Sequence, residues 1–198
     1  MSIFSSLPMT GFRIILFASF AAIFLLIFLA ILAASIGIEH KKYKLAAVLL
    51  SKFGADEAAA FRPDHIIYLL IRSGDYKKAR RWIDRALLKN PVPEYIALDA
   101  WLLAIEGNWK DVQTQVDAFA ALCKVNAHQE RADRQAMLDK SVPAFTAAAQ
   151  SRKHAQFLSI PVIENLEVSL GFVAYKIRTV LGILLAIIIG YVTYTLMS

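Results

Sequence analysis

Two long stretches without a charged residue, one near each end of the chain, constrain the fold most strongly. The first runs from Ile14 to Ile38, and the second runs from Thr179 to Met197. A helix of about 20 apolar residues crosses the roughly 30 Å hydrocarbon core of a bilayer. A cleaved signal peptide is the alternative for the first stretch, but its apolar region is only about 7–15 residues long. The sequence therefore predicts transmembrane helices at 14–38 and 179–197, the first preceded by a short tail, 1–13.

Composition supports a membrane protein with a folded middle. The chain has 198 residues, is 58% hydrophobic and has a mean hydropathy of +0.50, which is too apolar for an ordinary soluble domain. The apolar excess lies at the two ends, so the middle has the composition of a normal domain. A net charge of +6 is compatible with nucleic acid, with anionic lipid or with orientation in a membrane. The single cysteine, Cys123, excludes an internal disulfide.

The segment Pro63–Pro91 predicts two short amphipathic helices folded back on each other. Gly74-Asp75 interrupts the apolar pattern, and Asn90-Pro91 ends it. The motif Gly74-Asp75-Tyr76 returns further along the chain as Gly107-Asn108-Trp109. A lone hairpin of this size cannot bury its apolar face, so the repeat predicts stacked hairpins. The apolar face of the second helix recurs at helical spacing, at Tyr76, Ala79, Ile83, Ala86 and Leu87.

These residues resemble the tetratricopeptide repeat family. The likeness is best at Gly74-Asp75-Tyr76, Ala79, Ile83, Ala86 and Pro91. It is weaker in the second unit, where Val112 replaces the small alanine and Val116 the aromatic residue. The resemblance covers 60–124, about a third of the chain, and implies two helical hairpins of a protein-binding type. An ordinary antiparallel helical bundle is the alternative.

The flanking segments also read as helices. Segment 39–59 is expected to continue the first helix out of the membrane, because no proline or glycine follows Gly37 before Gly54. Tyr43 and Ala46 precede Tyr76 and Ala79 by the same interval that separates Gly74 from Gly107. This segment is therefore interpreted as half a repeat, with coincidence as the alternative.

Segment 125–160 predicts capping helices, one over Ala127–Lys140 and another opened by Pro143. Segment 161–178 predicts an amphipathic juxtamembrane helix that leads unbroken into the second span. No segment alternates as a strand would, so the expected fold is all-α, with repeat-like hairpins between two transmembrane helices. The stripe of segment 161–178 comprises Ile163, Leu166, Leu170, Val173 and Ile177.

The sequence offers no catalytic, metal or cofactor site, so an enzyme is not expected. It has no glycine-rich phosphate loop, no nucleophile elbow and no paired carboxylates. Its histidines, His40, His65, His128 and His154, stand far apart without partners at metal-ligand spacing. His40 at the membrane boundary is interpreted as solvated rather than as a haem ligand, and Cys123 as a core residue.

Two surfaces are candidates for partner binding. The resemblance implies a concave groove lined by Tyr68, Arg72, Trp101 and Ala104, suited to a hydrophobic helix or an extended segment. The alternative for Trp101 is a place in the core. A basic face has three interpretations: a solvated helix surface, a contact for anionic headgroups or a contact for an acidic partner. Nucleic acid is not expected, because no aromatic residues interleave with the cations. The basic face comprises Lys77, Lys78, Arg80, Arg81 and Arg85.

The expected function is a non-catalytic, membrane-anchored scaffold for protein interactions. It would be an accessory subunit or assembly factor that meets other membrane subunits through its spans and its repeat domain. The alternative is a tethered adaptor that recruits soluble partners. Positive charge flanks the middle domain at 41–52 and 176–178, whereas only Arg13 stands on the other side. This distribution predicts a bacterial or organellar inner membrane, with the middle domain on the cytoplasmic or matrix side.

Overall fold

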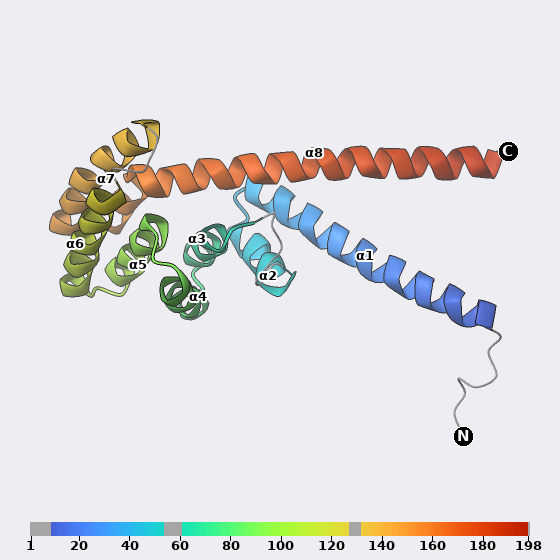
Figure 1. Ribbon diagram of the computed structural model, residues 1–198, viewed down its shortest axis with the longest axis horizontal. Helices are drawn as coiled ribbons and strands as arrows, with labels where there is room; N and C mark the ends of the chain where they lie inside the picture. Colours follow the sequence, from blue (N-terminus) through green and yellow to red (C-terminus); the bar gives the residue numbers. More distant parts are fainter. Residues whose placement is uncertain (1–8, 54–60, 127–131, 198) are drawn as a thin grey trace, which may run out of the picture.

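The structure is a computed structural model that describes residues 9–53, 61–126 and 132–197, and all of its regular elements are helices. The prediction of an all-α fold is confirmed for these residues. Figure 1 shows α8 running the length of the molecule, with α3–α7 gathered at one end and α1 diverging from α8. The helices are α1 (Met9–Glu39), α2 (Tyr43–Phe53), α3 (Pro63–Ser73), α4 (Tyr76–Lys89), α5 (Pro93–Ile105), α6 (Trp109–Asn126), α7 (Ala132–Ser151), the short 3₁₀ helix η2 (His154–Ser159) and α8 (Pro161–Met197).

The first six helices form three hairpins whose turns recur at a constant interval along the chain. Lys41, Gly74 and Gly107 close α1, α3 and α5, and all three have positive φ, at 54°, 81° and 76°. In each turn the left-handed residue donates its N–H to a carbonyl three residues earlier, and the next residue donates five residues back. This pair of hydrogen bonds is a common helix C-cap, which satisfies carbonyls that the helix leaves unpaired.

The same interval appears in the packing of the hairpins. Ala46, Ala79 and Val112 occupy equivalent positions, five residues after each left-handed turn residue, and each is completely buried in the second helix of its hairpin. A small or short side chain there lets the two helices of a hairpin approach closely. Neighbouring helices pack in sequence order from α1 to α7. The described chain therefore has repeated helix–helix packing of the kind that a helical repeat requires.

Two predictions about helix boundaries are wrong. The helix of the first apolar stretch does not continue into segment 39–59, because the turn at Lys41 ends α1 and folds α2 back against it. Pro143 does not open a new helix but lies inside α7. It is exposed, while Leu138 and Phe145 on the same helix are buried, so core packing holds α7 together across the missing hydrogen bond. The predicted helix start at Ala127 lies outside the described residues.

The last helix, α8, belongs both to the domain and to the region beyond it. Its 37 residues are continuous, and Ile163, Leu166 and Leu170 of the predicted stripe are buried against the domain. By length and composition, its part Pro161–Gly190 could cross a membrane. In α1, the apolar part with described side chains, Leu25–Glu39, is shorter than a span requires. Among the described residues, then, α8 is the one candidate span, and a second span at 14–38 stays a prediction.

Candidate functional site: the groove filled by α8

The concave side of the hairpins is an aromatic seam beneath α8. The Tyr68 ring of α3 meets Tyr43 of α2 edge-on, with centroids 6.4 Å apart, and the Trp101 ring of α5 at 5.9 Å. The Arg72 guanidinium lies 4.8 Å from the Tyr43 ring centroid, a cation–π distance. Because α8 packs on both α3 and α5, it closes this seam from above.

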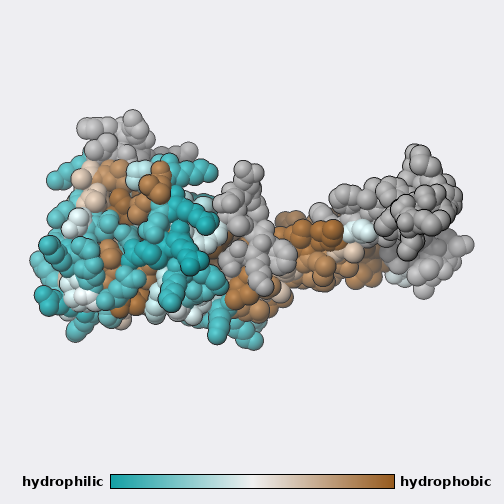
Figure 2. All heavy atoms as spheres, turned by 90° about the horizontal axis from the view of Figure 1, so that it is seen from below, coloured by the Kyte–Doolittle hydropathy of each residue, from teal (hydrophilic) through white to brown (hydrophobic). Residues whose placement is uncertain are grey.

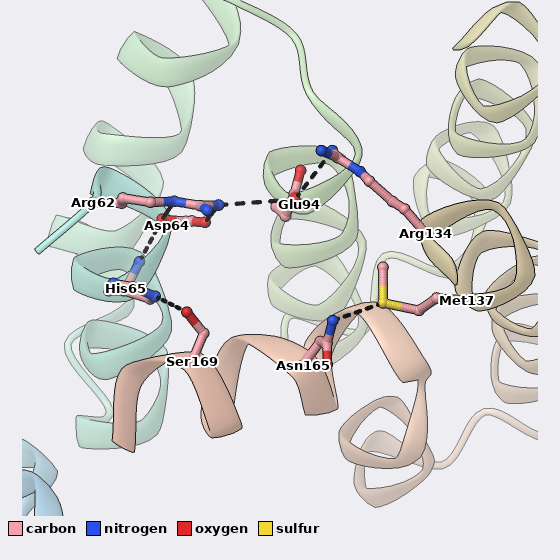
Figure 3. Close-up of polar contacts among 8 residues, drawn as sticks. All are labelled: Arg62, Asp64, His65, Glu94, Arg134, Met137, Asn165 and Ser169. Carbon is pink, nitrogen blue, oxygen red and sulfur yellow. Dashed lines mark hydrogen bonds and ion pairs between the residues drawn. The ribbon is translucent and has the colours of Figure 1, made fainter. Parts of the chain in front are cut away.

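Three hydrogen bonds from distant parts of the chain hold α8 in place. Tyr43 Oη donates to Glu167 Oε1 over 3.2 Å. Figure 3 shows the second contact, in which His65 Nε2 lies 3.2 Å from Ser169 Oγ. At the start of α8, the backbone N–H of Val162 donates to the buried Ser141 Oγ of α7, at 3.1 Å. This bond satisfies one of the amide groups that the first turn of a helix leaves free. The orientation of α8 on the domain is therefore fixed at several points along its first half.

The structure corrects the prediction of an open groove. Tyr68 and Ala104 are completely buried, Trp101 is 4% exposed, and Arg72 is half-buried. The sequence predicts all four on one surface, and the Tyr68 ring, the Trp101 ring and the Arg72 guanidinium do lie together on one side of α3 and α5. However, the apolar stripe of α8 already covers that side. In this conformation Trp101 is a core residue, which was the alternative to its role as a partner anchor.

A polar cluster connects α3, α5 and α7 at the edge of the seam (Figure 3). The buried carboxylate of Asp64 accepts from the His65 backbone N–H at 3.0 Å and forms an ion pair with Arg62. Glu94 lies 3.8 Å from Arg62 and 3.6 Å from Arg134, so it bridges the three helices. Both distances are long for ion pairs, and partly exposed pairs of this kind contribute little. The cluster positions helices rather than presenting a charged site.

His65, Ser169 and Asp64 have the residue types of a catalytic triad but not its geometry. A triad needs the carboxylate at the second ring nitrogen, where it orients the imidazole. Here Asp64 binds the backbone N–H of His65, and His65 Nδ1 has no hydrogen-bond partner among the described residues. Burial lowers the pKa of His65, an effect that Arg62 adds to and Asp64 opposes. His65 is therefore a neutral, buried contact for α8.

The basic face is smaller than the sequence predicted. Arg80 does not belong to it, because its guanidinium pairs with Asp99 of α5 and with Glu106 just after that helix, and so fastens α4 to α5. Asp99 is buried, and burial raises its pKa, although Arg80 opposes the shift. Lys77, Lys78, Arg81 and Arg85 are exposed as expected. Figure 2 shows the corresponding side of the domain as largely hydrophilic, in contrast to the apolar region where the long helices leave it.

The residues where α1 and α8 leave the domain resemble a membrane boundary in chemistry. Glu39 at the end of α1 forms an ion pair with Arg178 of α8. Two exposed rings of α8 each lie beneath a cation: Lys176 Nζ is 4.3 Å from the Phe172 ring centroid, and the Arg178 guanidinium is 5.6 Å from that of Tyr175. Aromatic and basic side chains together are typical of the bilayer interface. Beyond this point the described side chains of α8 carry no charge, and most of the exposed ones are apolar, among them Val180, Ile183 and Ile187.

Sequence reasoning missed the contacts that seat α8. Ser169 and Glu167 lie outside the predicted apolar stripe of α8, and their partners are 104 and 124 residues away along the chain. No local pattern signals such a pairing.

Across the described residues, no group of three His, Cys, Asp or Glu could hold a metal ion. Comparisons with protein-family models, with curated proteins and with solved structures gave no match.

Proposed function

We propose that this protein is a non-catalytic, membrane-anchored scaffold, an accessory subunit or assembly factor of a larger membrane protein complex. The observation that carries the proposal is the continuity of α8. One face of its first half packs on the helical domain, and its part Pro161–Gly190 is long and apolar enough to cross a membrane. A domain joined to a span through one unbroken, packed helix is held at a fixed height and angle to the bilayer.

The exposed surface of the apolar half supports partners within the membrane. Ile183, Ile187 and Ile188 of α8 are exposed in the single chain, and α1 diverges from α8 beyond their contact at Glu39 and Arg178 (Figure 1). We propose that α1 forms the second span. Two diverging spans leave room between them for lipid or for helices of other subunits.

The repeated turns support a likeness to tetratricopeptide repeats. The constant interval between Lys41, Gly74 and Gly107, with the same hydrogen bonds in each turn, is what a helical repeat of this kind produces. We propose that α1 and α2 form the first unit of this array, in which the membrane helix α1 takes the place of the first helix of the repeat. The adaptor alternative needs a free groove, and in this conformation α8 occupies it.

The proposed orientation places the helical domain on the cytoplasmic or matrix side. Its support is the basic residues on the domain side of the two uncharged stretches, Lys41, Lys42 and Lys44 after the first and Lys176 and Arg178 before the second. Labelling of a Lys89→Cys variant, in a background with Cys123 replaced by Ala, tests it in intact cells. An impermeant thiol reagent should react only after lysis. Reaction from outside without lysis would reverse the orientation.

Native purification in mild detergent tests the function. The proposal predicts that integral membrane proteins co-purify in fixed stoichiometry and stay bound through a high-salt wash, because apolar contacts are not screened by salt. An adaptor would instead lose soluble partners in the same wash. Recovery of the chain alone under all mild conditions would contradict both functions.

A further inference from the structure

Helix α2 folds back along α1 rather than continuing away from it. Lys42 donates its N–H to the Gly37 carbonyl over 2.6 Å, and a Cβ built on Gly37 would lie 3.7 Å from that of Ala46. Ala34, about one turn before Gly37 in α1, is completely buried. Figure 1 shows α2 lying beside the domain end of α1, next to α3.

This fold-back sets the height of α2 relative to the proposed membrane. The ion pair between Glu39 and Arg178 marks the level at which α1 and α8 become free of charged residues. Because α2 folds back so that Ala46 lies against Gly37, we infer that it lies level with the first turn of the span proposed for α1. Its outer surface therefore faces the boundary of the bilayer and not the bulk solvent above the domain.

The outer surface of α2 has the chemistry that such a position requires. Leu45 is 47% exposed and Val48, on the next turn, is 41% exposed. Lys41, Lys42 and Lys44 are exposed at the start of α2, and among the described residues none of them forms an ion pair with an acid. An apolar face flanked by lysines is typical of helices that lie in the headgroup region of anionic bilayers.

We propose that α2 is an interfacial helix that docks on an anionic lipid bilayer. Leu45 and Val48 contact the upper acyl chains, while Lys41, Lys42 and Lys44 contact lipid phosphates. The opposite face of α2, with Ala46, Ala47 and Leu50, stays packed on the protein. This inference rests on the proposed membrane anchoring and adds to it a defined lipid contact, which would stop the domain from tilting about its spans.

Nitroxide accessibility in the full chain, reconstituted in nanodiscs with anionic lipid, tests the proposal. Single labels are placed at Leu45, at Ile187 of α8 (62% exposed) and at Leu88 of α4 (88% exposed), with Cys123 replaced by Ala. Collisions with oxygen report lipid, and collisions with a neutral nickel chelate report water. The Leu45 label should lose most of the nickel collisions seen at Leu88 and gain oxygen collisions, as the Ile187 label does.

The three labels separate the failure of the inference from that of the proposed function. Nickel access at Ile187 would refute membrane anchoring itself. If the Ile187 label lies in lipid but the Leu45 label collides with nickel as often as the Leu88 label does, α2 lies in water and the inference is overturned. A Leu45 label shielded from both reagents would show that protein covers α2, either a partner or a second copy, and would also overturn it.

A charge-matched pair of variants tests the headgroup contact. Replacing Lys41, Lys42 and Lys44 by Gln should raise nickel access at Leu45 in anionic nanodiscs. Replacing Lys77, Arg81 and Lys89 of α4 by Gln removes the same charge from another exposed surface and should leave the Leu45 label unchanged. Equal effects of the two triple variants would contradict the assignment of phosphate contacts to α2.

Discussion

The backbone conformation of the repeated turns predicts whether a glycine-to-alanine substitution lowers or raises the free energy of unfolding. Gly74 and Gly107 have φ of 81° and 76°, and a Cβ added at either position would meet no heavy atom within 4 Å. Substitution by Ala therefore tests the left-handed conformation without steric overlap. That conformation costs an L-residue about 1–2 kcal/mol. The reduced freedom of the unfolded chain returns about 0.4–1 kcal/mol, so each variant should lose about 1 kcal/mol.

Gly171 is the matched control, because its change should act in the opposite direction. It lies within α8, is exposed, has no positive φ, and a Cβ there also meets nothing within 4 Å. Gly171→Ala should stabilise the protein by about 0.5–1 kcal/mol, the usual gain for alanine inside a helix. Lys41→Gly should also stabilise, by about 1 kcal/mol, because it relieves the same left-handed cost.

Thermal unfolding of the full chain in detergent, followed by circular dichroism, measures these effects. For a chain of this size, about 1 kcal/mol shifts Tm by about 2–4 °C. The account predicts lower Tm for Gly74→Ala and Gly107→Ala and higher Tm for Gly171→Ala and Lys41→Gly. If Gly74→Ala and Gly107→Ala matched Gly171→Ala in sign, the turns would not have the conformation on which the repeat rests.

Four further substitutions test burial and titration. Ala79→Leu should lower the free energy of unfolding by roughly 1–3 kcal/mol through overpacking, whereas Ala121→Leu on the exposed side of α6 should be nearly neutral; equal effects would argue against this register. Trp101→Ala should cost about 3–5 kcal/mol in chemical denaturation, because the ring lies in the core; a variant of unchanged stability that lost a partner would restore the open groove. Stability should fall as pH drops below about 6.5, because the unfolded chain then binds a proton that buried His65 resists. His65→Gln should flatten that part of a urea-denaturation pH profile, and an unchanged profile would locate the dependence elsewhere.

Local sequence signals predicted much of the fold. Helical spacing of apolar residues and the glycines at Gly74 and Gly107 act within a few residues, so they indicate helices and turns directly. The interval between the two glycine turns predicts that Ala46 and Ala79 occupy equivalent positions, and both are completely buried. The turn at Lys41 escaped detection because lysine carries no preference for the left-handed conformation.

The seating of α8 could not be predicted from local signals. A stripe of apolar residues shows that a helix face is buried but not what it is buried against. The partners of that face, such as His65 for Ser169, are 104 residues away, and their polar contacts leave no spacing pattern. The same limitation turned Tyr68 and Trp101 into candidates for partner binding. They lie on the surface at which the repeat resemblance implies a groove, and the chain itself fills it.

The most direct test of the account is whether α8 occupies this groove in native membranes. A double-cysteine variant, His65→Cys with Ser169→Cys, is made in a background with Cys123 replaced by Ala. It places thiols on α3 and α8 at positions where His65 Nε2 and Ser169 Oγ lie 3.2 Å apart. A short bifunctional thiol reagent should crosslink most of the chains within themselves. The control pair, Leu88→Cys with Ser169→Cys, should not react. Absence of the His65–Ser169 crosslink in folded, membrane-inserted protein would show that the groove is open and that α8 does not join the domain to the bilayer.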